Sequence, residues 1–155
     1  MFDITQFRQE IVIPHLSAIN IRSPHMVELL VFTCATESAG GTYVKQVKGP
    51  ALGIYQIEPS TFTDLWTNYI LRKPDIVNML SLHFGIHRVP QPQDVVYDLR
   101  LATVCAALLY MYRKAVPDDS EISTLWRLYK QYYNTEKGAA VEADSIKAYK
   151  KFAKL

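Results

Sequence analysis

The run from Tyr97 to Ala115 constrains the fold more than any other stretch of this 155-residue chain. Nearly every position in it is apolar or small, apart from Arg100 and the terminal pair Arg113-Lys114. A helix of this composition must be buried on most sides, and Pro117 stops it. The apolar part, Leu101–Met111, is about half of the ~20 residues that span a bilayer. We therefore expect a central core helix and no membrane insertion.

Shorter amphipathic patterns on both sides of this run predict further helices. Asp3 and Gln6 have the spacing of a capping box before the first of them, and Pro14 is expected to bend or end it. Glycine, proline and β-favouring residues over 42–57 predict a loop with at most a small β-hairpin. A chain of this length can bury one sizeable core, so we expect a single, mainly α domain over residues 1–155. The other predicted helices begin at Ser23 and Ser120, which are expected to cap them, near Pro59 and Ile76, and after Gly138.

Composition and charge limit the classes of binding partner and the cellular compartments that we expect for this protein. A net charge of +2 and a pI of about 8.5 are too mild to indicate a nucleic-acid binder. Residues 1–6 lack the basic and apolar regions of a signal peptide, so we expect no secretion by that route. Cys34 and Cys105 lie in apolar helical patterns, which predicts buried free thiols and leaves a disulfide as the alternative. His83 and His87 are four residues apart, but a glycine lies between them, and we expect no metal site.

Glu37 is the first candidate for chemistry. The apolar residues from Val27 to Cys34 have the spacing of one buried helical face, and three positions further along the same face is Glu37. The pair Gly40-Gly41 is expected to end this helix, which places the carboxylate in the last turn, where the macrodipole disfavours its ionised form. Burial acts in the same direction, so we expect a raised pKa. A carboxyl group that stays protonated near neutral pH suits general-acid cleavage of a glycosidic bond, and a structural carboxylate is the alternative.

The segment from Gly49 to Glu58 supplies the next candidates. Its glycines let the backbone approach a ligand closely, but the Lys-Ser/Thr of a phosphate loop is missing. Gln56 offers a donor and an acceptor beside Tyr55, a pairing suited to an N-acetyl group and a sugar face, or it stabilises a turn. Glu58 is either a second carboxylate of the site or the cap of the helix that follows. Two carboxylates permit hydrolysis, whereas one alone needs a nucleophile from the substrate.

Two further features have both a structural and a functional interpretation. Ser38, next to Glu37, either hydrogen-bonds a ligand or only ends the helix. Four lysines form a basic stripe at helical spacing near the C-terminus, which is either a solvated face or a weak attraction for polyanions of the cell wall or of nucleic acid. The stripe consists of Lys147, Lys150, Lys151 and Lys154.

Three short motifs give the chain a resemblance to a known family. Glu37-Ser38, Gly53-Ile54-Tyr55-Gln56 and Tyr133-Asn134 resemble, in this order, the three motifs of the soluble lytic transglycosylases, which belong with goose-type lysozymes to the lysozyme superfamily. The second motif of that family usually reads Gly-Leu-Met-Gln and the third Ala-Tyr-Asn, so this chain departs from both at their variable positions. The string from Gly49 to Thr61 looks most similar to small lysozyme-like proteins of tailed bacteriophages and prophages.

The resemblance implies a lysozyme-like helical domain that cleaves peptidoglycan between N-acetylmuramic acid and N-acetylglucosamine. Glu37 would protonate the glycosidic oxygen and then act as base on the substrate's own 6-hydroxyl, which releases a 1,6-anhydro sugar. Tyr133 would hydrogen-bond Glu37, and Asn134 would brace the site. An apolar residue is usual at the position of Glu58, and an acid there favours a true hydrolase. The expected substrate contacts are Ser38, Gly53, Tyr55, Gln56, Glu58, Tyr133 and Asn134.

The same resemblance implies partners and a location. We expect a monomer without cofactor or metal that binds peptidoglycan glycan strands and, as further partners, phage virion proteins, but no specific nucleic acid. It would be made in the host cytoplasm and act on the periplasmic cell wall or travel in a phage virion. Two rival interpretations remain: a lysozyme that uses water and Glu58, and a non-enzymatic virion or assembly protein that keeps the fold.

Overall fold

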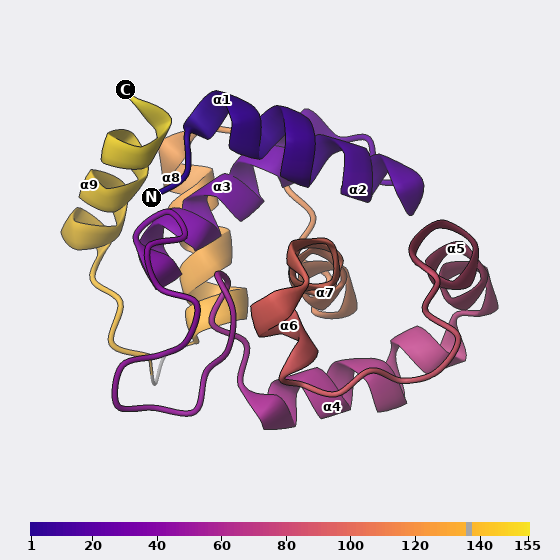
Figure 1. Ribbon diagram of the computed structural model, residues 1–155. Helices are drawn as coiled ribbons and strands as arrows, with labels where there is room; N and C mark the ends of the chain where they lie inside the picture. Colours follow the sequence, from indigo (N-terminus) through magenta and orange to yellow (C-terminus); the bar gives the residue numbers. More distant parts are fainter. Residues whose placement is uncertain (136–137) are drawn as a thin grey trace.

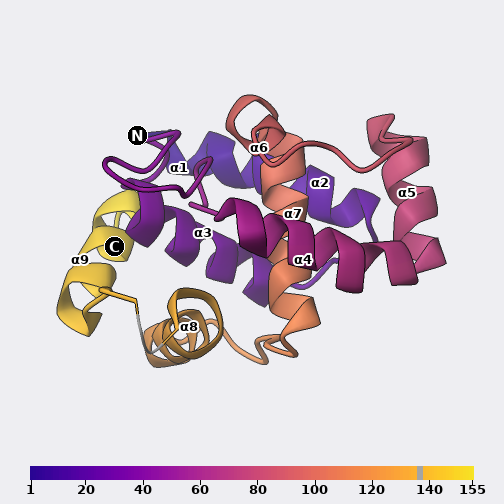
Figure 2. The ribbon, with the colours of Figure 1, turned by 90° about the horizontal axis from the view of Figure 1, so that it is seen from below.

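The computed structural model describes residues 1–135 and 138–155, which are mainly helical, as predicted. Helix α7 (Leu99–Tyr112) is the core of the fold, and all ten residues from Leu101 to Tyr110 are buried. Figure 1 looks along this helix, with α2, α3 and α4 around it, and Figure 2 shows α3 and α4 crossing it. The expectation of a central apolar helix is confirmed, since its neighbours cover it on several sides.

The described helices occupy most of the chain. In order they are α1 (Ile4–Gln6), a π-helix (Phe7–Val12), α2 (Ile13–Ala18), α3 (Pro24–Ser38), α4 (Pro59–Asn68), a 3₁₀ turn (Ile70–Arg72), α5 (Pro74–Phe84), α6 (Asp94–Tyr97), α7, α8 (Ile122–Leu128), a second π-helix (Tyr129–Asn134) and α9 (Glu142–Ala153). None of them is both long and apolar enough to cross a membrane.

The first helical segment continues past Pro14, so it does not end there. Asp3 caps the segment as expected, because its Oδ1 accepts the N–H of Gln6 at 3.0 Å. The six residues before α2 then adopt the wider π-helical turn, in which the N–H of Ile13 donates to the carbonyl of Arg8. Proline clashes with the preceding turn of a regular α-helix, and we attribute its tolerance here to this wider turn and to its place at the start of α2.

Helix α3 begins as predicted. It ends at Ser38, and the left-handed residue that terminates it lies one position before the glycine pair. The hydroxyl of Ser23 accepts the N–H groups of His25 and Met26, which caps the helix. Ala39 already has a left-handed φ of 51°, and Gly40 and Gly41 continue with positive φ. A Cβ on Gly40 would lie 2.7 Å from the ring of Phe152, so glycine is needed there for the last helix to pack against this turn.

The segment between α3 and α4 is a loop, and the described residues contain no strand. Two isolated antiparallel bridges, Lys45 with Leu52 and Leu52 with Ile57, are all that remains of the predicted hairpin. The turn at Gly53 approaches α6 closely, because a Cβ there would lie 2.7 Å from the Val95 carbonyl. The loop is therefore held against the helical core although it has no sheet.

Ser120 does not cap helix α8, contrary to the prediction. Its Oγ lies 2.7 Å from Nδ1 of His25, which ties the loop before α8 to the start of α3. Both cysteines are free and buried, as expected. On α9 the buried residues include Ser145, Tyr149 and Phe152, whereas Ala143 is exposed.

An ion pair joins the first helical segment, α3 and α9. The Arg8 guanidinium donates to both carboxylate oxygens of Glu28 on α3, at 2.6 and 3.0 Å. The Tyr149 hydroxyl on α9 donates to the same carboxylate at 2.8 Å. A bidentate pair of this kind with a third donor is a strong form of charged hydrogen bonding. We infer that it fixes both the first helical segment and α9 on α3, where Phe7 and Phe152 also pack against each other at 5.5 Å between ring centroids.

Replacing Tyr149 with Phe removes one donor from this half-buried carboxylate and keeps the ring. We expect Tyr149→Phe to lower the free energy of unfolding by roughly 1.5–3 kcal/mol in urea denaturation, the usual worth of a hydrogen bond to a charged group. Tyr43→Phe, at a tyrosine that is 50% exposed, is the control and should change it by less than about 0.5 kcal/mol. Equal effects would mean that Tyr149 contributes only its ring.

Candidate active site

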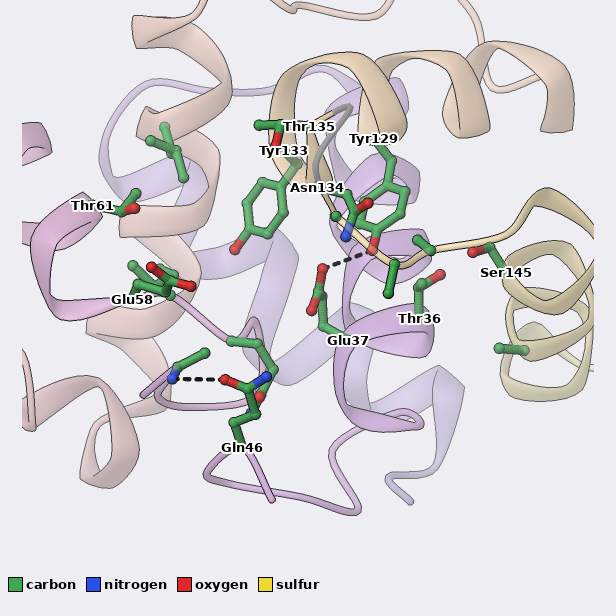
Figure 3. Close-up of a pocket in the computed structure, with 18 of the residues that line it drawn as sticks. Thr36, Glu37, Gln46, Glu58, Thr61, Tyr129, Tyr133, Asn134, Thr135 and Ser145 are labelled. Atoms are coloured by element: carbon green, nitrogen blue, oxygen red, sulfur yellow. Dashed lines mark hydrogen bonds between the residues drawn. The ribbon is translucent and has the colours of Figure 1, made fainter. Parts of the chain in front are cut away.

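Glu37 lies in the last turn of α3 at the wall of a cleft of about 580 Å³. The cleft runs between the loop before α4, the ends of α3 and α7, the second π-helix and the start of α9 (Figure 3). A volume of this size is within the usual range for small-molecule sites. The residues that line it are Thr36, Glu37, Gln46, Ala51, Gln56, Ile57, Glu58, Thr61, Leu109, Arg113, Tyr129, Tyr133, Asn134, Thr135, Gly138–Val141, Asp144, Ser145 and Ala148.

Burial raises the pKa of Glu37 to about 7, from an ordinary value of 4.5. The dominant cause is the loss of water around the charged form, and a hydrogen bond from Tyr129 partly opposes it. The carboxyl group also lies at the negative end of the α3 dipole, which disfavours ionisation further. The pKa of Glu37 is raised, as the sequence predicted, because the helix face that buries Cys34 also carries Glu37 inward.

The tyrosine that holds Glu37 is Tyr129 and not Tyr133. The Tyr129 hydroxyl donates to Oε1 of Glu37 at 2.7 Å, as the dashed line in Figure 3 shows. Tyr133, one turn further along the π-helix, donates instead to the backbone carbonyl of Tyr55 at 2.7 Å. The expected Tyr133–Glu37 bond is therefore wrong, and the motif tyrosine ties the loop before α4 to the site.

An aromatic wall of four residues surrounds this hydrogen bond. The ring of Tyr129 lies 5.6 Å from Phe32 and 6.1 Å from Tyr133, centroid to centroid, and Tyr133 stacks on Tyr110 at 5.1 Å. The Tyr110 hydroxyl is satisfied by Thr33 Oγ1 at 2.7 Å. Rings exclude water from the carboxyl group without offering it a cation, which is the physical origin of the raised pKa.

Glu58 lines the same cleft from the other side. Figure 3 shows it at the start of α4, across the cleft from Glu37 on α3. It occupies the N-cap position of α4, but its side chain makes no capping hydrogen bond, and it is exposed. Glu58 therefore stands at the cap position, but the prediction that its side chain caps the helix is wrong. Its carboxylate faces solvent and the cleft.

Three of the expected substrate contacts do not line the cleft. Ser38 is fully buried, where its Oγ donates to the Cys34 carbonyl at 3.1 Å and accepts the N–H of Gly41. Tyr55 is buried too, with its hydroxyl 3.1 Å from Thr103 Oγ1. Gly53 is packed under α6. These motif residues shape the loop and the end of α3 and are not among the residues that line the cleft.

Gln56 and Asn134 do lie in the cleft. Gln56 adopts a left-handed φ of 51° and donates from Nε2 to the Gly53 carbonyl at 2.9 Å, so it also stabilises its turn. Asn134 Oδ1 accepts from Lys130 Nζ at 2.9 Å, and the same ammonium reaches the Gly138 carbonyl at 2.9 Å. Lys130 thus joins the end of the π-helix to the linker before α9.

Sequence reasoning missed several polar residues of the cleft. Arg113 carried a weak signal, as a charge at the end of an otherwise apolar helix, and it donates to the Tyr132 carbonyl at 2.7 Å. Gln46 accepts the N–H of Ala51 at 3.1 Å. Thr36 Oγ1 is buried and has no hydrogen-bond partner among the described residues. Asp144 and Ser145 belong to α9, which no motif connected with Glu37.

The histidines and acids do not assemble a metal centre in the described part of the chain. His87 Nδ1 lies 2.8 Å from Ser81 Oγ, and no three His, Cys, Asp or Glu side chains of the described residues gather as ligands would. The described residues that line the cleft supply the carboxyl groups of Glu37, Glu58 and Asp144, together with amides, hydroxyls and one guanidinium.

No protein-family model, curated protein or solved structure matches this chain.

The raised pKa of Glu37 makes the stability of the protein depend on pH. Below about pH 4.5 the carboxyl group is protonated in both the folded and the unfolded chain, and its burial adds no ionisation cost. Between 4.5 and about 7 the unfolded chain ionises first, so stability falls as the pH rises, by about 3 kcal/mol in total. Glu37→Gln cannot ionise and escapes this loss.

We expect the difference in unfolding free energy between Glu37→Gln and the parent protein to grow in favour of the variant from pH 4 to pH 8. Urea denaturation at both pH values measures it. Glu58→Gln, which removes an exposed carboxyl group from the same cleft, controls for the change in net charge. A difference that is the same at both pH values would contradict the burial of an ionisable Glu37.

Proposed function

We propose that this protein is a peptidoglycan-cleaving lytic transglycosylase that breaks the β-1,4 bond between N-acetylmuramic acid and N-acetylglucosamine with Glu37 as its single acid and base. The observation that carries the proposal is a carboxyl group with a pKa of about 7 at the wall of an open cleft, held through one oxygen by Tyr129. General-acid cleavage of a glycosidic bond requires such a group. The motif resemblance supplies the substrate class.

The hydrogen bond from Tyr129 assigns the two carboxyl oxygens of Glu37 different tasks. Because Oε1 accepts the tyrosine hydroxyl, the acidic proton belongs on Oε2. That proton passes to the glycosidic oxygen as the bond to C1 of the muramic acid breaks. The carboxylate then takes the proton of the substrate's 6-hydroxyl, whose oxygen bonds to C1. The product is the 1,6-anhydro sugar, no water is consumed, and Glu37 is protonated again.

A pKa near 7 suits both halves of this cycle. A group whose pKa lies close to the working pH can donate a proton and accept one back without a large free-energy cost for either transfer. The aromatic wall, made of Phe32, Tyr110, Tyr129 and Tyr133, keeps water from the carboxyl group, and the Tyr129 hydroxyl stabilises the carboxylate that forms in between. The amide groups of Gln56 and Asn134 line the cleft where an N-acetyl group could be recognised.

Hydrolysis by a lysozyme mechanism is the second candidate function, and Glu58 is the observation that favours it. Its carboxylate is exposed, lies in the same cleft and makes no capping bond to α4. A second carboxylate on the other side of the scissile bond would activate a water molecule as the nucleophile. The reaction would then leave a reducing end in place of the anhydro ring.

Where the protein works is part of the proposal. We propose that it is made in the cytoplasm of a bacterial host of a phage or prophage and meets the periplasmic cell wall from there or from within a virion. A protein that keeps the fold as a non-enzymatic virion or assembly part is the alternative that the activity test must exclude.

Digestion of purified sacculi, followed by mass analysis of the soluble muropeptides, tests the proposal. We expect 1,6-anhydro muropeptides from the parent protein and a loss of about 100-fold or more with Glu37→Gln, the size of a general acid–base contribution. Glu142→Gln, at an exposed carboxyl group outside the cleft, is the matched control and should release as much as the parent.

The other outcomes separate the rival functions. Reducing-end products that disappear with Glu58→Gln would replace the transglycosylase by a hydrolase. No release beyond that of Glu37→Gln would overturn enzymatic function and support a structural protein.

A further inference from the structure

A second hollow adjoins the cleft along helix α9. It has a volume of about 460 Å³ and lies between α9 and the end of α3. Asp144 and Ala148, one helical turn apart, line both this hollow and the cleft, so the two are continuous over the first turns of α9. We call this hollow, together with the shared residues and Thr36, the α9 groove.

The α9 groove has an apolar floor and charged edges. Ala35, Ala39 and Phe152 belong to its lining, and small side chains leave room for a ligand backbone. Lys147 and Lys151, also one turn apart and both exposed, lie on the edge away from the cleft. Asp144 lies at the passage between groove and cleft. The ligand that fits carries carboxylates, an ammonium group and small apolar side chains.

A buried hydroxyl at the same place independently points to a ligand. Oγ1 of Thr36 is out of contact with solvent and has no partner among the described residues. Thr36 lines the cleft next to Glu37, and Figure 3 shows it between Glu37 and Ser145 of α9. A buried hydroxyl without a partner is costly, and a polar group of a ligand bound here would supply the missing partner.

We propose that the α9 groove binds the stem peptide of peptidoglycan, with its carboxylates on Lys147 and Lys151 and the ammonium of its diamino acid on Asp144. This inference rests on the proposed function, because the peptide enters the groove from a muramic acid held beside Glu37. The lactyl group of that sugar carries the peptide, which contains alanine, glutamate and a diamino acid. Its carboxylates have cationic partners in Lys147 and Lys151, its ammonium group has an anionic partner in Asp144, and its alanine methyl groups match the alanine floor.

The consequence is a preference for peptide-bearing glycan. A peptide-free disaccharide can occupy only the cleft, whereas the same disaccharide with a tetrapeptide also fills the α9 groove. The additional attraction is between exposed charges, so it must weaken as salt rises. Two of the four lysines of the basic stripe thereby acquire a specific task, and Lys150 lines neither hollow.

Calorimetric titration of the Glu37→Gln protein, which cannot cleave its ligand, tests the inference. The two probes are the N-acetylglucosamine–N-acetylmuramic acid disaccharide and the same disaccharide with its tetrapeptide. We expect the peptide-bearing probe to bind about tenfold more tightly. Lys147→Ala or Lys151→Ala should each reduce its affinity about three- to fivefold and leave the peptide-free probe unchanged, whereas Lys150→Ala should change neither by more than about twofold.

The outcomes distinguish this inference from the proposed function. Equal affinity for both probes, or an advantage of the peptide that survives in both lysine variants, would overturn the groove and leave the cleft as the sugar site. Binding of neither probe would overturn the groove and the peptidoglycan substrate together. Melting curves of the variants show that a loss of affinity is not a loss of folding, since all three lysines are exposed.

Discussion

The hydrogen bond from Tyr129 to Glu37 is the contact on which the rest of the site depends. It joins the last turn of α3 to the second π-helix across 92 residues of sequence. Once the carboxyl group is held there, the aromatic wall covers it and its pKa rises to about 7. The same π-helix turns Tyr133 toward the loop before α4, and this loop supplies the opposite side of the cleft.

Two glutamates on α3 each accept a hydrogen bond from a tyrosine hydroxyl, but they differ in whether a cation is paired with them. Glu28 accepts the Tyr149 hydroxyl, and Arg8 neutralises it with a bidentate ion pair. Glu37 accepts the Tyr129 hydroxyl, but within the described residues no cation pairs with it. Phe32, between the two along the helix, contacts both tyrosines, at 5.6 and 5.3 Å between centroids. The first glutamate therefore links three helical segments through an ion pair, whereas the second keeps its proton up to about pH 7.

The sequence predicted those parts of the fold that depend on local periodicity. The burial of α7, the Ser23 cap and the inward phase of Glu37 follow from spacings within one or two helical turns. Predictions failed where long-range contacts decide. Ser120 bonds His25 across 95 residues instead of capping α8, and Tyr129 displaces Tyr133 as the partner of Glu37. Asp144 and Ser145 join the site only because α9 packs against α3, which no local pattern encodes.

The central claim is that the surroundings of Glu37 hold a proton on it near neutral pH. A titration of its side-chain carboxyl carbon by ¹³C NMR, assigned by comparison with Glu37→Gln, measures this without any substrate. We expect a midpoint near pH 7, well above the ordinary 4.5 of a glutamate. A midpoint at or below 4.5 would contradict it, because Glu37 would then be ionised at neutral pH and could not act as the general acid.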